Sequence, residues 1–406
     1  MNLAFLKKLG PGLLFAGAAI GVSHLVNSTK VGAEFGFGLL WALLLVNLFK
    51  YPFFQFGPRY TAATGESLLD GYKKLGNGLL IAYFLLTFAT MFTIQTAVTI
   101  VTAGLAKQLF GLDFQMEIWS TIITLICLGI LTMGRYSFLD KLMKVIIITL
   151  TISTVIAVFF AMSDGNEALT GGQIFPEVAG GGMTLLIVFM GWMPAPLDIS
   201  IWHSLWAIEK RQETENFTPK TALFDFNFGY IITIILGICF MALGAYVMFN
   251  SGIEFSPKGG KFAEQLIDLY TTNLGSSAYI IIAVAAFTTM FSTTLTTLDA
   301  SPRAMAKTSQ LLFGKYIKHS YIFWMLILVI GTIIILTQFL TEMKTLVYIA
   351  TILSFVTAPF YAISNYLLIT SKHTPEALQP KLGLRILSWL GILFLVGFSV
   401  WYVVTL

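Results

Sequence analysis

The sequence predicts an all-α membrane protein with eleven transmembrane helices, and three observations lead to this prediction. Of the 406 residues, 57% are hydrophobic and 11% are charged, and the mean hydropathy is +0.83. Soluble globular domains carry about 25% charged residues, so this composition excludes that class. Apolar runs of the roughly 20 residues needed to cross a bilayer recur along the chain. Two of these runs are interrupted near their middles.

The expected spans follow one another with short connections between most of them. They cover residues 12–36, 39–58, 78–106, 117–133, 143–162, 182–207, 227–249, 277–300, 321–340, 345–370 and 383–405. With a cytoplasmic N-terminus, eighteen of the 24 Lys and Arg residues fall on the inner side and four on the outer side. The positive-inside rule therefore favours a multi-pass protein of the cytoplasmic membrane with its N-terminus inside and its C-terminus external.

The order of the spans predicts an internal repeat within a single transmembrane domain. Five spans over about residues 10–162 are followed by five over about 182–370, and one extra helix covers about 383–405. An odd-numbered unit re-enters the membrane facing the other way, so we expect an inverted repeat. The connection before the eighth span contains residues 262–270, which predict a short surface helix. The first and sixth spans become structural equivalents, and both are the interrupted ones.

The two interruptions predict a solute site in the middle of the membrane. They lie at Gly21-Val22-Ser23-His24 and at Met193-Pro194-Ala195-Pro196. Backbone groups freed by an unwound turn must face protein, water or a ligand, because hydrocarbon offers them no partner. A half-helix that ends presents carbonyls suited to a cation, and one that restarts presents N–H groups suited to an anion. The alternative for the first interruption is that its glycines only allow close helix packing.

The second interruption carries side chains with two interpretations each. Pro196 removes a backbone donor, so a continuous helix is not expected here. Asp198 follows, either as an acid that stabilises the restarted helix or as a carboxylate that contacts substrate. Met193 is either a soft ligand or a packing residue. Trp202 and His203, one turn further on, either line the pathway or pack.

Lys50 lies near the centre of the second span, where a charge costs about 2.5–3.5 kcal/mol to insert. It therefore needs a partner, and the candidates are Asp198, Asp299 or a bound anion. A static ion pair is one interpretation. Coupling to transport or contact with substrate is the other.

The eighth span is unusually rich in hydroxyl groups. Oxygen ligands suit a hard cation such as Na⁺, but Ser and Thr also join helices within membranes. Both interpretations stay open, and Gln95 and Thr357 are further pathway candidates. The polar residues of this span are Ser292, Thr293, Thr294, Thr296, Thr297 and Asp299.

The sequence carries no motif of an enzyme. The H-E-x-x-H, G-x-S-x-G and phosphate-loop patterns are absent, and the four histidines lie well apart in the sequence. We therefore expect neither catalysis nor a cofactor.

The first span and its surroundings resemble the Nramp family of metal-ion transporters. The family pattern G-P-G, followed eight residues later by D-P-G-N and then by A-G-A-x-F-G, aligns without gaps. It falls on Gly10-Pro11-Gly12, Gly21-Val22-Ser23-His24 and Val31-Gly32-Ala33-Glu34-Phe35-Gly36. Further similar residues are Leu39-Leu40-Trp41, Asn47-Leu48, Arg59 and Thr64-Gly65 in the second span, Met193-Pro194 in the sixth, and residues 292–300 in the eighth.

This resemblance implies the inverted-repeat fold of the leucine transporter and a secondary transporter that moves a divalent metal ion by alternating access, coupled to H⁺ or Na⁺. The chain is a divergent member in this comparison, because the D-P-G-N motif is missing. The family's Asp falls on Gly21, its Asn on His24, and third-span acids on Gln95 and Val98. On family grounds Met193, Asp198 and His24 are the expected metal ligands, with backbone carbonyls near Gly21 and Ala195. The alternative is a same-fold carrier for a small organic or anionic solute, possibly coupled to Na⁺.

Overall fold

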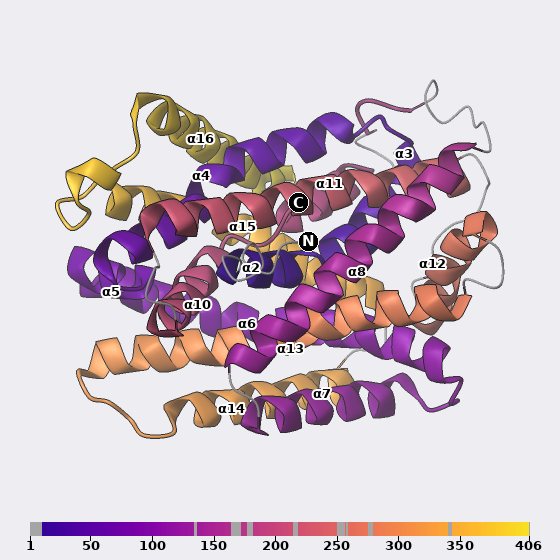
Figure 1. Cartoon of the computed structure of the whole chain (residues 1–406), viewed down its shortest axis with the longest axis horizontal. Coiled ribbons are helices and arrows are strands. Elements are labelled where there is room, and N and C mark those ends of the chain that lie inside the picture. Colours follow the sequence, from indigo (N-terminus) through magenta and orange to yellow (C-terminus); the bar gives the residue numbers. More distant parts are fainter. Residues whose placement is uncertain are drawn as a thin grey trace.

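The computed structural model describes residues 10–133, 136–163, 172–176, 182–213, 218–249, 256, 259–274, 279–339 and 343–405. Every regular element in this part of the chain is a helix. Most helices run along the long axis of the molecule, and α2 lies at the centre of the bundle (Figure 1).

The first half of the chain begins with the interrupted helix and continues with long rods. Its elements are α2 (Pro11–Ala19), a π-helix (Val22–Ser28), α3 (Thr29–Phe35), α4 (Leu40–Thr64), α5 (Leu68–Leu75), α6 (Asn77–Phe110), α7 (Met116–Met133) and α8 (Tyr136–Ser163). The short α5 begins with a capping box, in which Ser67 and Asp70 bond each other's backbone N–H groups.

The second half begins at α9, again with an interrupted helix. Its elements are α9 (Gly182–Trp192), α10 (Ile199–Glu213), α11 (Pro219–Met248), α12 (Gly259–Leu274), α13 (Tyr279–Phe313), α14 (Ser320–Ile334), a π-helix (Ile335–Phe339) and α15 (Met343–Ile369). A 3₁₀ turn (Glu376–Leu378) and α16 (Leu382–Thr405) follow. The helix α12 confirms the short helix predicted over residues 262–270.

Both predicted interruptions are present. In the first, α2 ends at Ala19 and the chain re-enters helical structure at Val22 as a π-helix. His24 therefore lies inside the restarted helix rather than in the unwound turn, which is shorter than expected. In the second, α9 ends at Trp192, and the six residues to Asp198 are not helical.

The N-terminus of α2 is held by α11, a helix of the second half of the chain. The Asp225 carboxylate accepts hydrogen bonds from Gly10 N at 2.9 Å and from Gly12 N at 2.7 Å. A Cβ at Gly12 would lie 2.1 Å from the Asp225 carbonyl oxygen, so only glycine fits there. The Gly10-Pro11-Gly12 motif therefore serves as a docking point for α2, with Pro11 at the first helical position.

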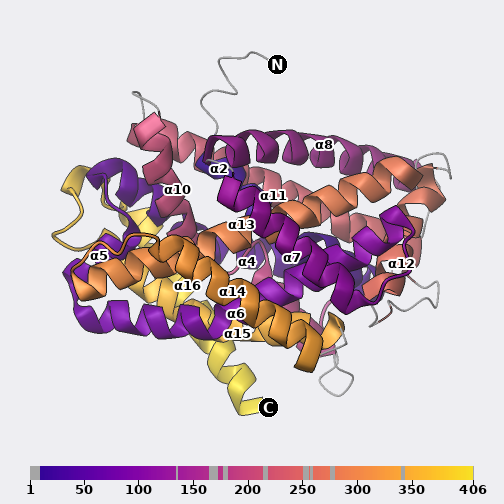
Figure 2. The ribbon, with the colours of Figure 1, turned by 90° about the horizontal axis from the view of Figure 1, so that it is seen from below.

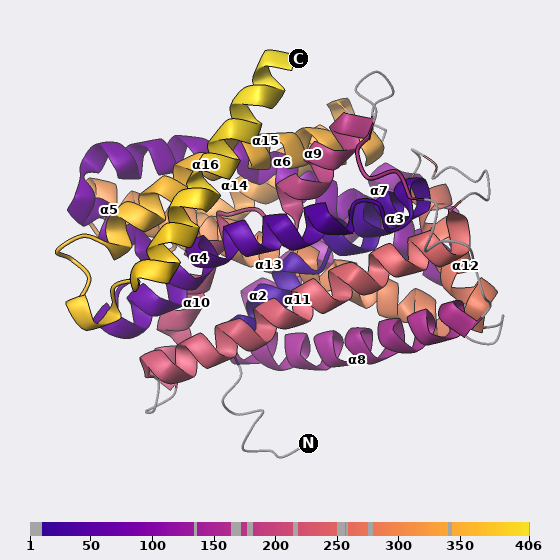
Figure 3. The same cartoon turned by 90° about the horizontal axis from the view of Figure 1, so that it is seen from above.

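Eight helices among the described residues are long and apolar enough to cross a membrane. The other three expected spans fall on α4, on α9 with α10, and on α13, each of which is helical at the expected place. The connection 314–319, α5 and the connection 370–381 gather at one end of the bundle, whereas α12 and the α6–α7 connection lie at the other (Figure 1). The C-terminal part of α16 projects from the face opposite α8 (Figures 2 and 3).

Candidate functional site

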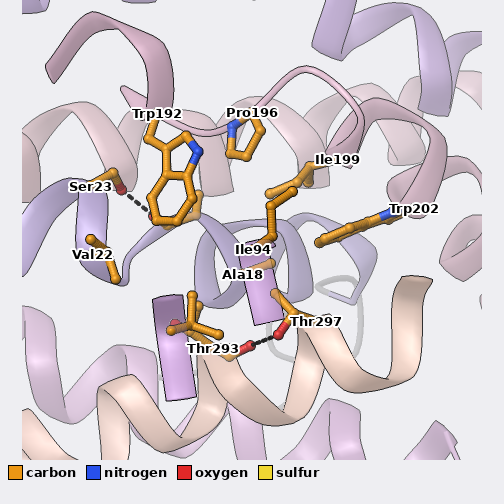
Figure 4. Close-up of a pocket in the computed structure, with 12 residues that line it drawn as sticks. Ala18, Val22, Ser23, Ile94, Trp192, Pro196, Ile199, Trp202, Thr293 and Thr297 are labelled. Atoms are coloured by element: carbon orange, nitrogen blue, oxygen red, sulfur yellow. Dashed lines mark hydrogen bonds between the residues drawn. The ribbon is translucent and has the colours of Figure 1, made fainter. Parts of the chain in front are cut away.

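A small cavity lies where the two interruptions face α6 and α13 (Figure 4). Two indole rings and several aliphatic side chains form most of its wall. The lining residues are Ala18, Ala19, Val22, Ser23, Ile94, Val98, Trp192, Pro196, Ile199, Trp202, Thr293 and Thr297. None of these side chains is ionisable, and the polar side-chain groups at the wall are three hydroxyls and two indole N–H groups. The indole nitrogen of Trp192 is already bonded to Ser354 Oγ at 2.8 Å.

Ser23 joins the two interruptions. Its Oγ lies 2.6 Å from Ala19 O at the end of α2, and 3.4 Å from Pro194 O in the unwound part of the sixth span. The sequence showed that Ser23 was a polar residue in the first interruption, but its role in the cavity wall was missed. Trp192 was missed too, although it is the last helical residue before the second interruption.

The C-terminal end of α2 is closed by α13. Thr293 Oγ1 lies 3.1 Å from Gly17 O and 3.3 Å from Ile20 O, as a hydrogen-bond donor. A Cβ at Gly21 would lie 2.7 Å from both the Oγ1 and the Cγ2 of Thr293. Gly21 therefore allows this close approach, and a hydroxyl occupies part of the carbonyl cluster that was expected to face a cation.

His24 is buried and bonded on both sides of its ring. Nε2 lies 2.9 Å from Thr233 O in α11, and Nδ1 lies 2.7 Å from Ser23 Oγ and 3.1 Å from Ala19 O. Each ring nitrogen either donates its proton to one of these oxygens or accepts the proton of the Ser23 hydroxyl. Neither nitrogen therefore has a lone pair free for a metal. His24 also does not line the cavity. In this conformation it ties the π-helix to α11.

Lys50 is buried, and its partners correct the sequence-based prediction. The ammonium donates to four carbonyl oxygens: Met190 at 2.8 Å, Gly191 at 2.8 Å, Met193 at 3.0 Å and Ala195 at 3.3 Å. Within the described residues, no carboxylate lies within the 4.0 Å of an ion pair with it. The predicted ion pair with Asp198 or Asp299 is therefore not formed.

Asp198 directly precedes α10, and its side chain is 4% exposed. Its Oδ1 has no hydrogen-bond partner among the described residues. The position fits the acid predicted at the start of the restarted helix. Asp198 is not among the residues that line the cavity.

Met193 and Ala195 are fully buried, and neither lines the cavity. The Met193 side chain packs beside Gly237 of α11, since its Sδ lies 3.4 Å from where a Cβ of that glycine would be. The carbonyl oxygens of Met193 and Ala195 both accept hydrogen bonds from Lys50. Across the described part of the chain, no three His, Cys, Asp or Glu side chains lie close enough to hold a metal ion. The expected ligands Met193, Asp198 and His24 are therefore not brought together around the cavity.

The hydroxyls of the eighth span bond mainly within the protein. Ser292 Oγ donates to Thr289 O at 2.6 Å, and Thr296 Oγ1 bonds Ser292 O at 2.9 Å. Thr297 Oγ1 donates to Gln95 Oε1 at 2.7 Å, which joins α13 to α6. These contacts support the interpretation as helix-joining groups, and a Na⁺ site at these hydroxyls stays a prediction.

Asp299 belongs to a separate polar cluster in the C-terminal half of α13. It accepts from Arg303 Nη2 at 2.8 Å, from Tyr321 OH at 2.7 Å and from Trp206 Nε1 at 3.2 Å. Arg303 Nη1 also bonds Glu209 of α10 at 3.0 Å. Asp299 is thus a structural acid in this conformation rather than a partner of Lys50.

The remaining pathway candidates differ in whether they line the cavity. Trp202 lines the cavity, and its Nε1 has no partner among the described residues. His203 is buried with its ring centroid 5.7 Å from that of Phe226, and its ring nitrogens have no described partner either. Thr357 bonds Leu353 O of its own helix at 2.9 Å and lies outside the cavity wall.

Comparison with solved structures shows the fold. The chain superposes on a manganese transporter of Eremococcus coleocola with a TM-score of 0.76 at 14% identity, over 98% of this chain and 87% of that one. It superposes on MhsT, solved in complex with L-phenylalanine, with a TM-score of 0.65 at 15% identity, over 98% of each chain. The chain therefore has the all-helical fold of these membrane transporters.

Comparison of sequences shows the family. An uncharacterised protein of Pasteurella multocida (strain Pm70) is 35% identical over 408 residues, which span 97% of this chain and 91% of that protein. The family model described as "Natural resistance-associated macrophage protein-like" matches residues 12–405. This match includes both interrupted helices and the whole cavity wall. The chain therefore belongs to the Nramp family, a family of membrane transporters rather than enzymes.

Proposed function

We propose that this transporter moves a small, uncharged organic solute by alternating access around the cavity between the first and sixth spans. The supporting observation is the wall of that cavity, which combines two indoles, aliphatic side chains and three hydroxyls with no ionisable side chain. Such a wall suits an apolar body with one or two hydrogen-bonding groups.

The interrupted helices supply a second argument. The carbonyls at the end of α9 are bonded to Lys50, and those at the end of α2 to Thr293. A cationic cargo would therefore have to displace groups that the chain itself provides. A neutral solute avoids that competition, and MhsT, which has a similar fold, holds an organic molecule.

The test is flux into proteoliposomes. Labelled neutral heterocycles and amides, amino acids, carboxylates, Mn²⁺ and Mg²⁺ would each be offered, with H⁺ and Na⁺ gradients applied in turn. We expect uptake of one of the neutral classes, and the gradient that drives it identifies the coupling ion. Uptake of metal alone would overturn the proposal.

Two matched variants test whether the solute binds in this cavity. Trp202→Ala removes a wall of the cavity and is expected to lower kcat/KM about tenfold, because losing an aromatic contact costs on the order of 1.4 kcal/mol. Trp389→Ala is the control, since Trp389 lies on α16 with 54% exposure, outside the cavity wall. Equal effects of both changes would contradict the proposed site.

A divalent metal ion is the second candidate, favoured by the similarity to the Eremococcus coleocola manganese transporter. It requires another conformation in which His24, Met193 and Asp198 turn toward the cavity and the carbonyls of Gly21 and Ala195 become free. Mn²⁺ uptake lost in both His24→Ala and Asp198→Ala would favour this candidate. Mn²⁺ uptake that survives both changes would refute those ligands.

The membrane arrangement is part of the same proposal. We propose eleven crossings, a five-plus-five inverted repeat with one extra helix, a cytoplasmic N-terminus and an external C-terminus. The excess of Lys and Arg on the proposed inner side supports this orientation.

A further inference from the structure

The ammonium group of Lys50 is bound as a small cation would be. Lys50 is 0% exposed, and its Nζ lies between 2.8 and 3.3 Å from four backbone carbonyl oxygens of the sixth span. An ammonium has three N–H donors, so the four oxygens exceed the number of linear hydrogen bonds that it makes. The group is surrounded by oxygens from the last turn of α9 and from the unwound segment that follows it.

The sequence explains why these oxygens are free. In an uninterrupted helix, Met190 O would accept from the backbone N–H of residue 194, but that residue is Pro194, which has none. Gly191 and Met193 carry carbonyls whose own partners are lost because the chain leaves the helix after Trp192. Carbonyls at the end of a half-helix carry the negative end of its dipole, and they commonly coordinate Na⁺ in transporters of interrupted helices.

Among the described residues, no carboxylate forms an ion pair with Lys50. Asp198 interacts with Lys50 electrostatically, but in the described part of the chain it is not within ion-pair distance. Placing a lysine in the membrane interior costs about 2.5–3.5 kcal/mol, so the carbonyl cluster must supply most of the compensation.

We propose that the interrupted sixth helix forms a monovalent-cation site and that Lys50 occupies it permanently as a tethered cation. The chain therefore needs no soluble ion at this position, whatever solute it carries. A substitution that removes the Lys50 side chain and leaves its space empty opens the carbonyl site to a free cation. This inference does not depend on the identity of the transported solute.

The experiment compares two neutral variants that differ in the space they leave. Lys50→Ala vacates the site, whereas Lys50→Met fills it with an apolar chain of similar length. The melting temperature of each purified protein is measured in NaCl, KCl, methylammonium chloride and N-methylglucamine chloride at equal ionic strength. The last cation is too large for the site and serves as the reference.

We expect Lys50→Ala to melt at least about 2 °C higher in methylammonium or Na⁺ than in N-methylglucamine, because a ligand that binds the folded state stabilises it. Lys50→Met should show no such gain. Lys30→Ala is the control for loss of a lysine, since Lys30 contacts Tyr348 and Glu34 at a different place in the fold. The wild-type response is subtracted from each variant.

Two results would overturn the inference. One is a Lys50→Ala protein whose response to the four salts equals that of Lys50→Met or of the wild type. The other is failure to isolate Lys50→Ala in any of the salts, because a small cation should replace the lost ammonium. Neither result would affect the flux assay on the wild-type protein, so the proposed function is judged separately.

Discussion

Thr293 and Gly21 show how one contact sets the geometry of the first interruption. The Thr293 hydroxyl bonds two carbonyls at the end of α2, and it does so only because Gly21 has no side chain in its way. Thr293 also lines the cavity. Gly21 therefore allows close helix packing, which is one of the two interpretations that the sequence leaves open.

Gly21→Ala is expected to destabilise the protein by about 1–3 kcal/mol, because the new Cβ would overlap Thr293 and force the helices apart. In a Thr293→Ala background the same change should cost less, since the overlapping atoms are gone. Unfolding of the wild type, both single variants and the double variant gives the coupling energy of this cycle. Additive effects would show that Gly21 is needed for some other reason.

At the scale of elements, the polar cluster around Asp299 fastens the second half of the interrupted sixth span. Trp206 and Glu209 belong to α10, Asp299 and Arg303 to α13, and Tyr321 to α14. Three helices therefore meet through one buried carboxylate and one arginine. The cluster holds α10 in place while α9, on the other side of the interruption, is held by Lys50.

Arg303→Ala is expected to lower the free energy of unfolding by about 3 kcal/mol, because it leaves the Asp299 carboxylate buried without its positive partner. Lys307→Ala is the control on the same helix. Lys307 pairs with Asp70 at 2.7 Å nearer the surface, so its loss should cost at most about 1 kcal/mol. Denaturant unfolding of the two variants side by side measures the difference between their free energies of unfolding. Equal losses of stability would show that the cluster around Asp299 contributes no more than a surface ion pair.

At the scale of the whole molecule, the connections sort into two groups at opposite ends of the bundle (Figure 1). Asp113 lies in the α6–α7 connection at one end, and Lys318 lies in the α13–α14 connection at the other. Both are exposed. These two positions therefore report which end faces the cell exterior.

In a background with Cys127 and Cys239 replaced by Ala, Asp113→Cys is expected to react with an impermeant maleimide in intact cells. Lys318→Cys should react only after the membrane is opened, because the positive-inside rule places that connection in the cytoplasm. Labelling followed by gel shift is the measurement. The reverse pattern would invert the proposed orientation without changing the fold.

The sequence alone determined the class of protein and the places where its helices break. Hydropathy runs of spanning length predicted helices at eleven places, and each falls on helical structure. Pro194, Pro196 and the glycines near Gly21 predicted the interruptions, because loss of a donor or of a side chain acts locally along the chain. Such local effects can be read without knowing which helices are neighbours.

The role of each polar residue depends on how the helices pack against one another. The sequence offers an acid or a bound anion as the partner of Lys50, but Lys50 bonds carbonyls 140 to 145 positions away in the chain. His24 was expected to bind substrate, but it bonds Thr233 of α11, and Ser23 and Trp192 form the cavity wall instead. A polar group buried in a membrane needs a partner inside the protein, because lipid offers none. That partner is chosen by the packing of helices distant in sequence, so no local pattern reveals it.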